Sequence, residues 1–132
     1  MTNWIENIRW NEEGLLPVTV QEVGTAKIIM FAWMNRETLE ESIKQKKAIY
    51  WSRSRNQVWI KGESSGHFQY IEDIFLDCDN DSLLIKVIQE GGIACHTGRK
   101  SCFYNRINME TNQIEINEKV MKDPKEIYKD KK

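Results

Sequence analysis

The chain has 132 residues, of which 30% are charged and 40% hydrophobic, with a formal net charge of −1. This length fits one domain, and the near-neutral charge gives no basic field for nucleic acid. The longest apolar run, at 28–34, is too short to span a bilayer. The N-terminus lacks the basic and apolar segments of a signal peptide. We therefore expect a cytoplasmic protein with reduced thiols, and neither a membrane nor a nucleic-acid partner.

The hydrophobic pattern predicts a single α+β domain over 1–132, rich in strands, with its core at about 15–107. Alternation at 18–23 and the apolar run at 27–33 predict a hairpin, whose second strand should be central and buried on both faces. Asn35 is a favourable N-cap for the one main helix, expected to run to about Lys47. Further strands are expected at 48–51, 58–60, 68–76, 82–89, 102–107 and 114–116. Residues 108–132 form a charged C-terminal tail, expected to be loose from Val120 onward.

The stretch 77–102 concentrates residues that bind metals. It contains all three cysteines of the chain, Cys78, Cys95 and Cys102, and His96 follows Cys95 directly. Three thiolates suit zinc and leave the fourth tetrahedral position open, which is the catalytic pattern. His96 is suited to act as a general base near neutral pH. Two alternatives remain from the residues alone: cysteines buried as small apolar side chains, or a disulfide between two of them.

The same stretch begins with carboxylates at alternate positions, Asp77, Asp79 and Asp81. Carboxylates suit magnesium better than zinc. In an extended backbone the three would point to one side and Cys78 to the other, which predicts two separate metal sites. The alternative is an acidic surface turn without a metal.

A second polar region follows the strand that ends near Trp51. Arginine forks suit phosphate, hydroxyls and backbone amides near glycine add donors, and tryptophans can stack on a purine. The alternative is a solvated basic loop. The candidate substrate-binding residues are Trp51, Arg53, Arg55, Lys61, Ser65 and Gly66, with Trp59 as a second stacking candidate.

Five sequence blocks, at 34–37, 51–55, 59–66, 77–81 and 94–103, together resemble the phosphoribosyl-AMP cyclohydrolase family. The resemblance spans roughly 15–107. Family members often have proline before the Ala-Cys-His triplet, where this chain has Ile93. Bifunctional members carry a second domain after this one, and the chain length suggests the monofunctional form.

The resemblance implies a compact β-rich pseudo-barrel of mostly antiparallel strands, capped by one main helix, in an interlocked homodimer. It implies one zinc per subunit on Cys78, Cys95 and Cys102, with ligands shared across the dimer. It also implies magnesium on the three aspartates. The implied activity is zinc-dependent hydrolytic opening of the purine ring of 1-(5-phosphoribosyl)-AMP at the C6–N1 bond, the third step of histidine biosynthesis. His96 would accept or relay the proton.

Two other functions compete with this interpretation. A zinc purine deaminase would carry an H-x-E and P-C-x-x-C signature, and neither occurs in this sequence. A zinc-stabilised nucleotide- or nucleic-acid-binding module would need a closed, four-ligand site. His96 as a fourth ligand would supply it.

Overall fold

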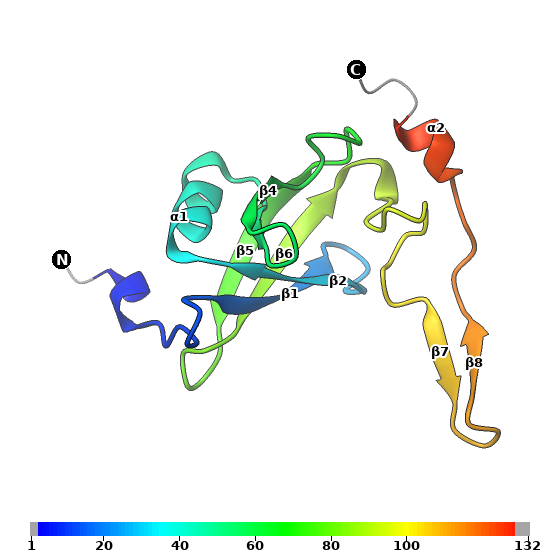
Figure 1. Ribbon diagram of the computed structural model, residues 1–132, viewed down its shortest axis with the longest axis horizontal. Helices are drawn as coiled ribbons and strands as arrows, with labels where there is room; N and C mark the ends of the chain where they lie inside the picture. Colours follow the sequence, from blue (N-terminus) through cyan, green and yellow to red (C-terminus); the bar gives the residue numbers. More distant parts are fainter. Residues whose placement is uncertain (1–2, 129–132) are drawn as a thin grey trace.

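The computed structural model describes residues 3–128, and Figure 1 shows an α+β domain from which one hairpin projects. Within this range, α1 is the one long helix. The elements in chain order are η1 (Trp4–Asn7), β1 (Leu16–Glu22), β2 (Ile28–Met34), α1 (Arg36–Gln45), β3 (Ile49–Ser52), β4 (Gln57–Ile60), β5 (Gln69–Leu76), β6 (Leu83–Gln89), η2 (Glu90–Gly92), β7 (Asn105–Asn108), β8 (Gln113–Ile116) and α2 (Pro124–Tyr128).

Three sheets make up the β structure. The largest has the strand order β2-β1-β6-β5, and only the β1–β6 pair is parallel. The hairpins β3–β4 and β7–β8 form two further sheets. The predicted α+β class and the mostly antiparallel pairing are therefore confirmed. The strands between residues 3 and 128 do not close into a barrel, so the implied pseudo-barrel is not found in this chain.

Alternate residues of the two central strands form the core. In β6, Leu83, Ile85 and Val87 are buried on one face, as the alternation predicted, and Val18 and Val20 of β1 lie beside them. Side chains from α1 and β3 complete this cluster. Burial at every second position is the expected result when one face of a strand packs on a core.

Strand β2 differs from the prediction. It lies at the edge of the four-stranded sheet, and Phe31 on its outer face is 47% exposed. An apolar run does not by itself distinguish a central strand from an edge strand with exposed aromatic side chains. The outer edge of β2 is covered in part by the segment around Cys102, whose N–H donates to the Ile29 carbonyl at 2.8 Å. Covering an edge in this way protects its unpaired backbone groups.

Helix α1 begins with the predicted cap. The Asn35 side chain accepts from the Thr38 N–H at 2.8 Å, and the Thr38 hydroxyl accepts from the Asn35 N–H at 2.9 Å. This reciprocal pair is a capping box. The buried Ser42 hydroxyl accepts the Ile49 N–H at 2.9 Å, which fastens α1 to β3.

The chain after β8 returns to the body. The N–H groups of Met121 and Lys122 donate to the Gly98 carbonyl at 2.8 and 3.3 Å, and Arg99 Nε donates to the Glu118 carbonyl at 2.9 Å. The start of the segment expected to be loose is therefore attached to the loop around Gly98, while residues 129–132 lie outside the described range. No helix among residues 3–128 is long and apolar enough to cross a membrane.

Candidate functional site

The loop at 93–102, here called the cysteine loop, follows β6 and η2. The Ala94 N–H donates to the Lys100 carbonyl at 3.2 Å, and the Cys95 N–H donates to the Arg99 carbonyl at 3.1 Å. These bonds fold the loop back on itself, and its far end is fastened to β2 through Cys102. The fold thus brings Cys95 and Cys102 together at one end of the main sheet.

The two thiols of this loop interact directly. Cys95 is buried, and its sulfur accepts a hydrogen bond from the Thr97 hydroxyl at 3.0 Å. Cys102 is exposed as a residue, yet burial of its sulfur, followed by the neighbouring Cys95, raises the pKa of the Cys102 thiol to about 12. A bound cation would supply the positive charge that favours both thiolates. The donor pair therefore fits a soft divalent ion such as zinc.

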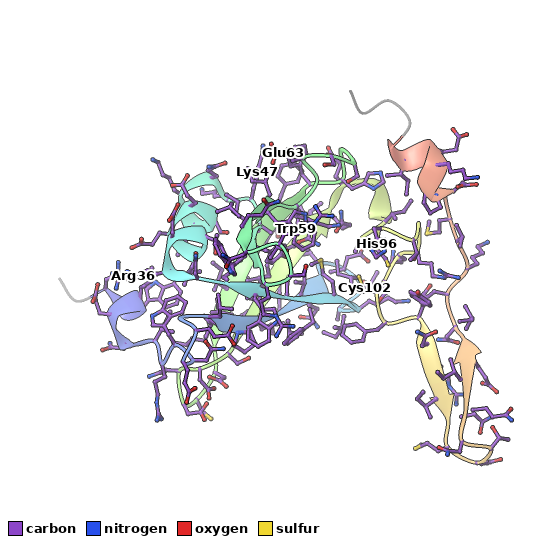
Figure 2. All side chains as sticks on the ribbon, in the orientation of Figure 1. Arg36, Lys47, Trp59, Glu63, His96 and Cys102 are labelled. Carbon is purple, nitrogen blue, oxygen red and sulfur yellow. The ribbon has the colours of Figure 1, made fainter. Side chains whose placement is uncertain are left out.

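His96 lies at the rim of a hollow beside these thiols. Figure 2 shows His96 and Cys102 at the same end of the body, with Trp59 on the side of the β3–β4 hairpin. The hollow has a volume of about 90 Å³, and it shares Trp59, Ser64 and His96 with a groove of about 760 Å³ along that hairpin. A groove of this size falls within the usual range of small-molecule sites. The hollow is lined by Met30, Trp59, Lys61, Gly62, Ser64, Ser65, Ala94, His96 and Cys102.

The predicted substrate-binding residues do not all line the same hollow. Arg55 lines the groove, and Ser65 lines the hollow. The Arg53 guanidinium lies 4.4 Å from the centre of the Trp33 ring, beside a different hollow. Trp51 lines neither the groove nor the hollow. The Gly66 N–H is already bonded to the Gly62 carbonyl at 2.7 Å.

A buried polar network supports the floor of the hollow and was not predicted. The Tyr50 hydroxyl donates to Gln69 at 2.5 Å, and the Gln69 amide donates to Gln89 at 2.8 Å and to the Met30 sulfur at 3.1 Å. Burial, and then the nearby Cys102, raises the pKa of Tyr50 well above its ordinary value. Glutamines at inward positions of two strands were the signal that could have indicated this network, because a buried amide requires partners.

The aspartates lie in the turn between β5 and β6. The Asp77 carboxylate accepts the N–H groups of Asp81 at 2.9 Å and Ser82 at 3.2 Å, and Asn80 has a left-handed backbone with φ of 64°. The predicted extended backbone is therefore wrong, because the Asp77 carboxylate bonds the chain into a turn. The three carboxylates still converge, with ligand oxygens of Asp77, Asp79 and Asp81 within 4.8 Å of one another. Hydrogen bonds that Asp77 accepts, first from the Asp81 backbone, lower the pKa of Asp77. A side-chain hydrogen bond with Asp79 raises the pKa of Asp81.

Three oxygen donors at this spacing fit a hard divalent cation such as magnesium. A hollow of about 490 Å³ lies beside the turn and is lined by Trp33, Asp79 and Asp81 among others. This arrangement places the carboxylates and the Cys95–Cys102 pair in separate parts of the chain.

Cys78 is exposed in this same turn and does not lie with the other cysteines. The turn is at one end of β6 and the cysteine loop follows the other end, as Figure 1 shows. β6 has seven residues, which corresponds to about 23 Å. One chain therefore brings Cys95 and Cys102 together and leaves Cys78 far from both.

The chain was compared with known protein families and with individual proteins. The family model described as phosphoribosyl-AMP cyclohydrolase matches residues 30–104. A phosphoribosyl-AMP cyclohydrolase of Methylibium petroleiphilum is 54% identical over 129 residues, covering 96% of this chain and 98% of that protein. The one of Cellvibrio japonicus is 51% identical over 128 residues, covering 97% and 100%. The chain therefore belongs to the phosphoribosyl-AMP cyclohydrolase family.

Proposed function

We propose that the protein opens the purine ring of 1-(5-phosphoribosyl)-AMP by zinc-dependent hydrolysis of the C6–N1 bond, a step of histidine biosynthesis. Similarity to named cyclohydrolases over nearly the whole chain supports the activity. One observation carries the chemistry: Cys102 and His96 line a single hollow, and the Cys102 thiol interacts with that of Cys95. The thiols suit zinc, and the imidazole suits proton transfer.

The zinc site would be shared between two copies of the chain. Cys95 and Cys102 of one copy provide two ligands, and Cys78 of a second copy provides the third. Ligands of one tetrahedral zinc lie roughly 4 Å apart, far less than the length of β6. A two-fold axis would create two equivalent sites, because each copy gives both halves. The projecting β7–β8 hairpin, on which Ile107, Ile114 and Ile116 are more than half exposed, offers an apolar surface for such contact.

Zinc held in this way would supply Lewis-acid activation of the attacking water. Substitution at N1 makes C6 of the purine electrophilic. His96, at the rim of the hollow, would accept the proton that water loses as its oxygen bonds to C6. The C6–N1 bond then breaks, N1 departs as part of a formamidine with the proton that His96 returns to it, and C6 keeps its amino group as a carboxamide. The net change is addition of one water, without loss of ammonia.

Neighbouring side chains would bind the rest of the substrate. The ring of Trp59, 40% exposed and 5.4 Å from that of Tyr50, offers a fixed face for the purine. Arg55 in the groove and Arg53 beside Trp33 would bind phosphate. Magnesium on the three aspartates would bring a further positive charge to a phosphate at the shared site. The cytoplasm suits this chemistry, because its reducing conditions keep thiols free to bind metal.

Two variants test the assignment. Cys95→Ser should lose both zinc and turnover of 1-(5-phosphoribosyl)-AMP. His96→Ala should keep zinc and lose turnover by about 10²- to 10⁴-fold, the usual contribution of a general base. Both should remain folded dimers by sedimentation and circular dichroism. Near-normal turnover of either variant would overturn its assigned role.

A further inference from the structure

Lys61 is the buried cation of the hollow, and its contacts differ from those of the exposed arginines nearby. It follows β4 directly and is only 8% exposed. Its Nζ donates to the Ala94 carbonyl at 2.5 Å and lies 5.7 Å from the centre of the Trp59 ring. Ala94 is the residue immediately before Cys95. A side chain of the β3–β4 hairpin thus reaches the base of the cysteine loop.

The backbone around Lys61 directs the side chain toward this loop. The Lys61 N–H donates to the Ala48 carbonyl at 3.3 Å, which fixes the end of β4 against β3. Gly62 has a φ of 95°, and a Cβ there would overlap the backbone of Phe68. Glycine therefore permits the sharp turn that follows Lys61. With the backbone held on both sides, the lysine side chain extends into the interior rather than into the groove.

The charges around Lys61 also indicate that its ammonium interacts with the cysteines. Among residues 3–128 no carboxylate forms an ion pair with Lys61. A buried ammonium without a counter-charge is costly to the fold. Burial lowers the Lys61 pKa, and Cys102 and Cys95 are the groups whose negative charge would raise it. The ammonium is therefore compensated by the Ala94 carbonyl, which accepts its hydrogen bond, and by the negative charge that the two thiols would carry when ionised.

We propose that Lys61 is a positioning residue for the metal site, not a ligand of substrate phosphate. Its ammonium holds the Ala94 carbonyl, fixes the entry of the cysteine loop, and lines the same hollow as Cys102 as the one buried positive charge among residues 3–128. A hydrogen bond that fixes the backbone next to Cys95 restricts the orientation of this ligand, as hydrogen bonds to the ligands themselves do in other metal sites. The proposal rests on the proposed function, because it takes Cys95 and Cys102 as zinc ligands.

The test measures zinc and nucleotide binding separately, with the full-length protein and AMP as the nucleotide probe. Lys61→Met should weaken zinc affinity by about 10- to 100-fold in competition with a chelator. Its AMP affinity in saturating zinc should stay within about twofold of wild type, because no phosphate contact is lost. Arg55→Met is the matched control, since Arg55 lines the groove and forms no ion pair with the cysteine loop among residues 3–128. It should weaken AMP binding and leave zinc affinity unchanged.

The opposite pattern for Lys61→Met, weaker AMP binding with normal zinc affinity, would overturn the proposal, as would no change in either. If Lys61→Met does not fold, zinc affinity and AMP affinity are measured instead for Lys61→Gln and Lys61→Arg, and the same two patterns support or overturn the proposal. A crystal structure of the AMP complex gives an independent answer. Lys61 Nζ on Ala94 supports the proposal, and Nζ on a phosphate oxygen contradicts it. Absence of zinc binding by the wild-type protein would instead count against the proposed function itself.

Discussion

The separation of Cys78 from the other two cysteines leads to a quantitative prediction. About 23 Å of β6 divides the turn that holds Cys78 from the cysteine loop, whereas two ligands of one zinc lie roughly 4 Å apart. If the site is shared, Cys78→Ser and Cys95→Ser damage opposite halves of it. Each variant alone should be inactive, because both sites of either homodimer lack a ligand.

Mixing the two variants should restore activity. In a heterodimer, one site combines the intact cysteine loop of one chain with the intact Cys78 of the other, while the second site lacks both groups. Random exchange makes half of the dimers mixed, so about one quarter of all sites are complete. The expected turnover of 1-(5-phosphoribosyl)-AMP is therefore about one quarter of wild type per chain, once exchange is verified with two affinity tags.

A matched mixture provides the control. Cys95→Ser and Cys102→Ser damage the same half of the site, so no heterodimer contains a complete set of ligands and no activity should return. Verified exchange without recovery in the first mixture would refute the shared site. Recovery in the control mixture would refute it equally, since that result requires a different assignment of ligands.

Three further predictions concern the turn, the loop and pH. Asp79→Asn should weaken magnesium binding measured by calorimetry and leave zinc content unchanged, because the aspartates and Cys95 lie apart; equal loss of both metals would contradict this. Gly98→Ala should lower the Tm by roughly 4–8 °C. The left-handed φ of 86° costs a residue other than glycine about 1–2 kcal/mol, and the new Cβ would overlap the Lys122 carbonyl. An unchanged Tm would exclude the attachment of Lys122 to the loop around Gly98. The Cys102 thiol has a pKa of about 12 when folded and 9.0 as its ordinary value, so the unfolded chain binds fewer protons between these values. The free energy of unfolding of the metal-free protein should therefore fall as pH rises from 9 to 12. Urea unfolding should show a smaller fall over the same pH range for Cys102→Ser.

Local chemistry made part of the fold predictable from sequence. Asn35 starts α1 through contacts within four residues, and alternation in β6 identified its buried face, so both could be inferred from neighbouring residues alone. The position of β2 at a sheet edge could not, because strand order depends on pairing between distant segments. The same limit applies to Lys61, whose sequence context resembles a phosphate site but whose partner, Ala94, is distant in sequence.

The candidate site was likewise predictable from sequence only in part. Carboxylates at alternate positions indicated a metal site, and they do converge, although through a turn rather than an extended strand. The pairing of Cys95 with Cys102 depends on how the cysteine loop folds back and attaches to β2, which spacing alone does not determine. The buried network of Tyr50, Gln69 and Gln89 required three strands to be placed before its hydrogen bonds could be recognised.

Mass spectrometry can follow the proposed ring opening itself. 1-(5-phosphoribosyl)-AMP is incubated with the purified protein in water labelled with heavy oxygen, with zinc and after removal of zinc. A zinc-dependent cyclohydrolase should give a product that has gained one labelled water, retains all its nitrogen, and forms only when zinc is present. Exchange of the amino group for labelled oxygen would identify a deaminase. Unchanged substrate with a folded, zinc-loaded protein would contradict catalysis and indicate a binding role.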